Sequence, residues 1–145
     1  MGVDPGTNIL GYSVICADKN TIKILINGVI MLKKTDDHFV RLGIIYSKLC
    51  SLIDTYQPLS MAIEAPFFGK NVQSMLKLGR AQGAAIVAGA SKSLDVTEYS
   101  PRRIKQSISA TGNTLFNAAR KCQQGAGCKN VNVYIKPYRV AKIFR

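Results

Sequence analysis

The sequence predicts an α/β fold in which helices flank a mixed five-stranded sheet. Short runs of β-branched and apolar residues, separated by turn residues, fill the first part of the chain, which is typical of an antiparallel β-meander. Stretches with the apolar spacing of amphipathic helices then alternate with short apolar strands, as expected for strands added to a sheet through helices. The chain has 145 residues, which is enough for one domain with its own hydrophobic core.

The predicted meander begins with a short strand. Only residues 1–3 precede Asp4, whereas strands average about five residues. Residues 9–15 form the next predicted strand. After a polar turn, residues 21–32 are predicted to form one long strand or two short ones around Asn27-Gly28.

Two long helices are predicted next, with one strand between them. Residues 39–56 carry apolar side chains at helical spacing, and this helix is expected to end before Pro58. Residues 60–63 form a short apolar strand. The second helix, at residues 71–92, is rich in Gly and Ala, which favours close packing either onto the sheet or across a dimer axis.

The last predicted elements are a strand at residues 95–99 and a helix that begins at Pro101 and runs to about residue 110. Proline suits the first turn of a helix, because its missing N–H would have no partner there. The complete order is therefore three strands, helix, strand, helix, strand and helix.

Asp4 ends the first predicted strand and opens a glycine-rich turn, Asp4-Pro5-Gly6-Thr7-Asn8. Pro5 presets its own φ, and Gly6 can adopt the positive φ that the third position of a type II turn requires. A carboxylate at a strand end, beside exposed backbone N–H groups, can bind a metal ion, a phosphate group or both. The alternative is a β-turn in which the Asp4 side chain bonds only to its own backbone.

Glu64 is the expected partner of Asp4. If the strand before Asp4 and the strand at residues 60–63 lie side by side in parallel, both acids emerge at the same edge of the sheet, where ligands of open α/β sheets bind. Two carboxylates can hold one Mg²⁺, with waters and substrate phosphate as the other ligands. Alternatively, Glu64 caps its strand or pairs with Lys70.

The net charge of +12 is concentrated near the C-terminus. Residues 1–98 contain ten basic and eight acidic residues, whereas residues 99–145 contain ten basic residues and no acid. This distribution predicts a polyanionic partner such as a nucleic acid.

The remaining composition predicts a soluble cytoplasmic protein. No apolar run is long enough to span a membrane, and the N-terminus does not resemble a signal peptide. The spacing of Cys16, Cys50, Cys122 and Cys128 fits neither a zinc site nor a disulfide framework, so we expect reduced thiols. His38, the single histidine, receives no predicted role.

Several short runs of residues occur in order within residues 1–113. They are Val3-Asp4-Pro5-Gly6-Thr7, Gly11-Tyr12, Ala62-Ile63-Glu64, Phe67, Gly69-Lys70-Asn71, Leu76-Lys77-Leu78-Gly79-Arg80-Ala81-Gln82-Gly83, Glu98-Tyr99-Ser100-Pro101 and Ile104-Lys105-Gln106. Together these runs resemble the RuvC family of Holliday-junction resolvases. The most specific part runs from Glu64 to Gly83.

The resemblance implies an RNase H-like fold and Mg²⁺-dependent paired nicking of four-way DNA junctions, in homologous recombination and DNA repair. By position, Asp4 and Glu64 match the first two catalytic carboxylates of the family. The resemblance implies two Mg²⁺ ions for the family, whereas this chain, with two such carboxylates, is expected to bind one ion or to bind Mg²⁺ weakly. The resemblance further implies a homodimer, with the branch-migration proteins RuvA and RuvB as partners.

The resemblance and the charge together imply a DNA-binding surface. The predicted DNA-binding residues are Phe67, Lys70, Asn71, Arg102, Arg103 and Lys105. Phe67 matches an aromatic residue that stacks near the junction crossover, and base–aromatic stacking contributes about 1–3 kcal/mol per base. Alternatively, one of Phe67 and Phe68 belongs to the core, and the basic residues form a solvated face.

The C-terminal part departs from the family. The resemblance implies a second pair of carboxylates on a C-terminal helix, but no Asp or Glu follows Glu98. We therefore predict a resolvase domain at residues 1–113 and a divergent basic tail at residues 114–145, and we hypothesise that this tail is out of frame or otherwise substituted relative to the family. With half of the carboxylates missing, the chain is expected to bind branched DNA more readily than it cuts it.

Two other functions fit parts of the sequence. A non-catalytic module that binds branched DNA would share the basic surface. The run from Val3 to Gly11 also resembles the first phosphate loop of sugar kinases and actin-like ATPases, but these proteins need a second domain to close over ATP, for which 145 residues leave no room.

Overall fold

The computed structural model of this chain describes residues 1–17, 22–33, 35, 37–66 and 71–104. Their elements follow the predicted order, and the region around Asn27-Gly28 forms a single long strand. The elements are β1 (Gly2–Asp4), β2 (Ile9–Ala17), β3 (Ile22–Met31), α1 (His38–Tyr56), β4 (Ser60–Glu64), α2 (Val72–Ser91) and β5 (Asp95–Tyr99). A further helical turn begins at Pro101 and is described as far as Ile104.

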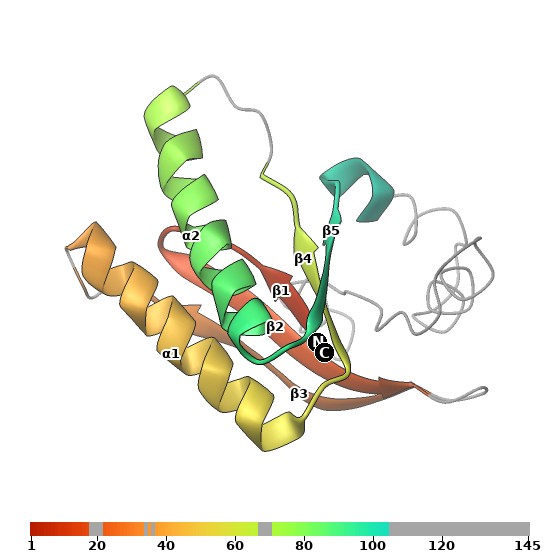
Figure 1. Ribbon diagram of the computed structural model, residues 1–145. Coiled ribbons are helices and arrows are strands. Elements are labelled where there is room, and N and C mark those ends of the chain that lie inside the picture. Colours follow the sequence, from red (N-terminus) through yellow and green to blue (C-terminus); the bar gives the residue numbers. More distant parts are fainter. Residues whose placement is uncertain (18–21, 34, 36, 67–70, 105–145) are drawn as a thin grey trace, which may run out of the picture.

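Within the described residues, five strands form one mixed sheet in the order β3-β2-β1-β4-β5. β1 pairs with β2, and β2 with β3, in antiparallel fashion, so the predicted meander is confirmed. β1 and β4 are parallel, as are β4 and β5. Figure 1 shows α1 and α2 side by side across one face of this sheet. The short strand β1 therefore occupies the centre of the sheet.

The hydrophobic core lies between the sheet and these two helices. α1 contributes one buried residue per turn from Ile45 to Ile53, and α2 contributes small residues that let its backbone approach the sheet. The buried core residues are Met1, Val3, Leu10, Val14, Ile30, Leu32, Ile45, Leu49, Ile53, Met61, Ile63, Ala81, Ala85 and Ala88.

Side-chain caps and a left-handed residue define the helix ends. Asp37 caps α1, because its Oδ1 accepts a hydrogen bond from the backbone N–H of Phe39 at 2.7 Å. Gln57 ends α1 in the left-handed conformation, with φ 44°, directly before Pro58. These features explain why the helix spans the predicted range.

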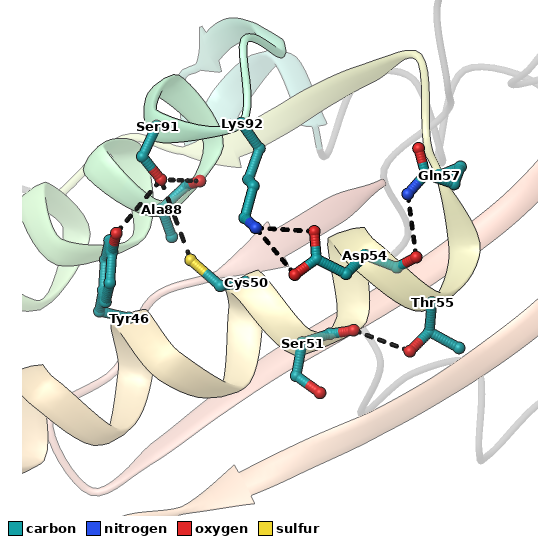
Figure 2. A network of polar contacts seen from close by, with 9 residues as sticks. All are labelled: Tyr46, Cys50, Ser51, Asp54, Thr55, Gln57, Ala88, Ser91 and Lys92. Atoms are coloured by element: carbon teal, nitrogen blue, oxygen red, sulfur yellow. Dashed lines mark hydrogen bonds and ion pairs between the residues drawn. The ribbon is translucent and has the colours of Figure 1, made fainter.

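Polar contacts join the C-terminal halves of α1 and α2 (Figure 2). The Tyr46 hydroxyl donates a hydrogen bond to Ser91 Oγ at 3.4 Å, and Lys92 Nζ lies 2.8 Å from Asp54. Cys50 Sγ lies 3.9 Å from Ser91 Oγ. The Lys92–Asp54 ion pair is exposed and contributes about 0–1 kcal/mol, so the buried apolar residues of both helices hold them in place.

The structure also bears on membrane spanning and on the state of the cysteines. In the part of the chain that the structure describes, neither long helix is apolar enough over a sufficient length to cross a membrane. The two cysteines found there, Cys16 and Cys50, are free thiols.

Two helical glycines are expected to respond oppositely to alanine. A Cβ at Gly89 would lie 2.8 Å from Val96 Cγ2 and 3.2 Å from Met61, whereas a Cβ at Gly43 would meet nothing within 4 Å. Gly89→Ala should therefore lower the free energy of unfolding by about 1–3 kcal/mol through overpacking. Gly43→Ala should raise it by about 0.5–1 kcal/mol, because alanine favours the helix. Urea unfolding measures both, and equal effects would contradict the packing of α2 on the sheet.

Candidate active site

The pairing of β1 with β4 brings the two predicted carboxylates to one edge of the sheet. Gly2 lies beside Ala62 and Val3 beside Ile63, so the next step along both strands reaches Asp4 and Glu64. The backbone holds this register through a hydrogen bond from Ala62 N to Met1 O at 2.8 Å. The parallel arrangement expected from the sequence is therefore confirmed.

Asp4 and Glu64 line the same pocket, which has a volume of about 170 Å³. Its walls come from the ends of β1 and β4, from α2 and from the start of the last helical turn. The lining residues are Asp4, Pro5, Glu64, Ala65, Pro66, Leu78, Gln82 and Pro101. Asp4 is half-buried and Glu64 is only 7% exposed. Two carboxylates in a largely apolar pocket favour a bound cation, because like charges repel in poorly solvated surroundings.

The donor set suits one hard divalent cation. Carboxylate oxygens are the ligands that Mg²⁺ prefers, and one or two of them suffice when waters and phosphate oxygens complete the octahedron. Across the described residues, no group of three or more His, Cys, Asp or Glu side chains is placed to hold a metal ion. The described part of the pocket therefore supplies two carboxylate side chains as cation ligands.

Gln82 is a pocket residue to which the sequence reasoning gave no role. Its side chain is 7% exposed, and its Nε2 donates hydrogen bonds to the backbone oxygen of Glu64 at 3.4 Å and to Glu98 Oε2 at 3.1 Å. It thus ties α2 to the ends of β4 and β5 beside the carboxylates. The sequence feature that could have indicated this role is that Gln82 is the single polar residue among the Gly and Ala residues at positions 81–85.

The turn after Asp4 differs from the sequence expectation. The type II turn with a positive φ at Gly6 is wrong, because the φ of Gly6 lies outside the left-handed range. Glycine is required there for space, since a Cβ would lie 2.0 Å from the carbonyl oxygen of Ile9. The turn is also bound to the residue that follows β3, because Leu32 N donates a hydrogen bond to Asn8 O at 2.9 Å.

The structure describes three of the predicted DNA-binding residues. Arg102 and Arg103 are exposed and directly follow Pro101, which lines the pocket. The Arg103 guanidinium lies 5.6 Å from the centre of the Tyr99 ring. Asn71 caps α2, because its Oδ1 accepts a hydrogen bond from Ser74 N at 3.0 Å. Two exposed arginines therefore follow a pocket-lining residue directly in the chain.

The other predicted DNA-binding residues, Phe67, Lys70 and Lys105, lie outside the described residues. The same holds for the alternative pairing of Glu64 with Lys70. It holds also for the tail at residues 114–145, so the domain boundary at residue 113 stays a prediction.

Comparison with known proteins gives a consistent result. The family model for crossover junction endodeoxyribonuclease RuvC matches residues 1–126. The RuvC of Porphyromonas gingivalis is 54% identical over 113 residues, which is 78% of this chain and 60% of the relative. The RuvC of Cytophaga hutchinsonii is 52% identical over 113 residues, with 78% and 56% covered. The chain thus spans about 60% of the length of these curated relatives.

Solved structures support the fold. The structure described as Thermus thermophilus RuvC in complex with Holliday junction substrate has a TM-score of 0.68 and 25% identity, covering 89% of this chain and 78% of that one. Another Thermus thermophilus RuvC structure gives the same TM-score at 22% identity, with 91% and 84% covered. The predicted RNase H-like fold is confirmed.

Gln82→Leu should lower the free energy of unfolding by about 1–2 kcal/mol, because the ends of β4 and β5 lose hydrogen bonds from a buried amide. Gln73→Leu is the matched control, since Gln73 is an exposed residue of the same helix. Urea unfolding of both variants checks the difference. Equal stabilities would mean that the Gln82 contacts do not hold the strand ends.

Proposed function

We propose that this chain recognises four-way DNA junctions and nicks them in a metal-dependent reaction. The chain belongs to the RuvC family of crossover junction endodeoxyribonucleases. The observation that carries this proposal is the shared pocket of Asp4 and Glu64, at the edge where two parallel strands end. The family relationship supplies the substrate class, and the pocket supplies the chemistry.

Asp4 and Glu64 would hold Mg²⁺ in the pocket that they line. When bound, such an ion polarises a phosphodiester group and lowers the pKa of a water that attacks it. The apolar side chains of Pro5, Pro66 and Leu78 line the same pocket and would lower the local dielectric constant, which strengthens the attraction between carboxylates and cation. Each protein group therefore has a role in binding or desolvation.

Arg102 and Arg103 would bind the DNA backbone next to the pocket. Both are exposed, and a guanidinium can bind two phosphate oxygens at once. Asn71, Lys70 and Lys105 would extend this surface. Phe67 would stack on a base near the crossover.

The alternative function is a non-catalytic module that binds branched DNA. One observation favours it, because the described residues bring only two carboxylates to the pocket and two-metal cleavage uses more. The hypothesis that the tail is out of frame belongs to this alternative. It predicts that another reading frame of the coding DNA after residue 113 encodes a helix with paired acids.

Asp4→Asn and Glu64→Gln should each reduce Mg²⁺-dependent nicking of a labelled four-way junction by about 100-fold or more, since a change next to a metal ligand already costs 10–100-fold. Asp95→Asn is the control, because Asp95 is an exposed acid on the neighbouring strand. Denaturing gels with Mg²⁺ or EDTA measure nicking, and native gels measure binding.

Each outcome of this experiment has a defined meaning. Nicking by Asp4→Asn at the wild-type rate would remove the metal role of the pocket. A wild-type chain that shifts the junction but never nicks it would replace the enzyme proposal with the binding module.

The proposed assembly is a homodimer formed through α2. Apolar and small residues form an exposed stripe along this helix, opposite the face that packs on the sheet. Leu76 is 58% exposed and Val87 55% exposed, and a Cβ at Gly79 or Gly83 would meet nothing within 4 Å. Such a stripe permits close approach of a second helix. A cytoplasmic location and partnership with RuvA and RuvB complete the proposal.

The double variant Leu76→Asp/Val87→Asp should convert the dimer to a monomer, because burying two carboxylates in an apolar interface is unfavourable. Light scattering coupled to gel filtration gives the mass directly. Leu59→Asp serves as the control, since Leu59 is 79% exposed and lies outside α2. A dimer that persists in the double variant would exclude the α2 interface.

A further inference from the structure

We propose that Arg41 is a positioning residue, which holds the turn that carries Asp4 and so sets the geometry of the cation site. The inference rests on the proposed function, because it concerns the same pocket. Arg41 itself lies on α1 and does not line the pocket. It would act through the turn alone.

The Arg41 guanidinium connects three separate segments of the chain. Its Nη1 donates hydrogen bonds to the backbone oxygen of Thr7 and to Asn8 Oδ1, each at 3.0 Å. Its Nε donates a hydrogen bond to the backbone oxygen of Thr35, in the link between β3 and α1. One side chain therefore joins the turn after Asp4 to the start of α1.

The position of this turn directly affects the position of Asp4. Asp4 is the last residue of β1, and residues 5–8 close the gap to β2. The turn is tightly packed at Gly6, because the backbone of this residue lies against the Ile9 carbonyl. A displacement of Thr7 or Asn8 must therefore move the chain next to Asp4.

The other end of the contact is rigid. Arg41 lies in the first turn of α1, where its backbone N–H donates to Asp37 O at 3.2 Å. The buried residues Ile45 and Leu49, on the following turns, anchor the helix to the core. The hydrogen bonds of the guanidinium thus hold the turn in a fixed position relative to α1.

The geometry specifically requires arginine. Its Nε and Nη1 point in fixed directions and reach separate acceptors, whereas the ammonium group of lysine is a single point on a flexible stem. The acceptors of these three hydrogen bonds are carbonyl and amide oxygens, so lysine would keep the charge and lose the geometry. Arg41→Lys therefore isolates the positioning effect.

The test measures Mn²⁺ binding to the full chain by calorimetry, which needs no cleavage activity. Arg41→Lys should weaken Mn²⁺ binding about tenfold, in the range that changes around metal ligands produce. Hydrogen exchange of the peptide covering residues 5–8 should accelerate in the same variant. Lys48→Gln, at an exposed site on the same helix, should change neither quantity.

Asn8→Ala is a second variant, which removes one acceptor and leaves Arg41 in place. It should weaken Mn²⁺ binding in the same direction by a smaller factor, and it keeps the proposal testable if Arg41→Lys fails to fold. Junction binding in EDTA should be unchanged in both variants, whereas a general loss of structure would weaken it.

The failure of this inference differs from the failure of the proposed function. If wild-type protein binds Mn²⁺ and Arg41→Lys binds it equally well, Arg41 serves only the fold and the inference is overturned. If wild-type protein binds Mn²⁺ but leaves junctions intact, the cleavage proposal fails while the role of Arg41 stands. If wild-type protein binds no Mn²⁺, both are overturned.

Discussion

Strand β1 has three residues, yet it pairs with β2 on one side and with β4 on the other. The parallel pairing with β4 is a constraint on which the whole candidate site depends, because a shift of one residue would turn Asp4 and Glu64 to opposite faces. Val3 and Ile63 protect the register, since both are fully buried in the core beneath α1 and α2. Burial of apolar neighbours therefore positions two charged groups that would not associate by themselves.

Contacts outside the sheet support each carboxylate separately. On the β4 side, Gln82 binds the backbone of Glu64 from α2. On the β1 side, Arg41 binds the turn after Asp4 from α1, and Gly6 allows that turn to close. Both helices thus have two functions, because one face of each packs on the sheet while a polar side chain reaches the edge where the strands end.

The order of elements could be predicted, because it follows from the local alternation of apolar residues. The shared location of Asp4 and Glu64 could also be predicted, because the carboxyl ends of parallel strands meet at one edge of the sheet. The contacts of Gln82 and Arg41 could not. Arg41 donates hydrogen bonds to the backbone oxygen of Thr7 and to the side chain of Asn8, more than thirty positions away in the chain, and no spacing of residue types indicates such a contact. At Gly6 the sequence predicted that glycine was needed but gave the wrong reason, since the close approach of Ile9 appears only in three dimensions.

The most direct test of this account is a crystal of the full chain soaked in Mn²⁺, whose anomalous scattering locates the ion. The account predicts an Mn²⁺ peak in the pocket, within about 2.0–2.4 Å of a carboxylate oxygen from both Asp4 and Glu64. A pocket without a peak at millimolar Mn²⁺, or an ion bound by other residues, would contradict it. In that case the two acids would be a structural feature of the strand ends, and not a cation site.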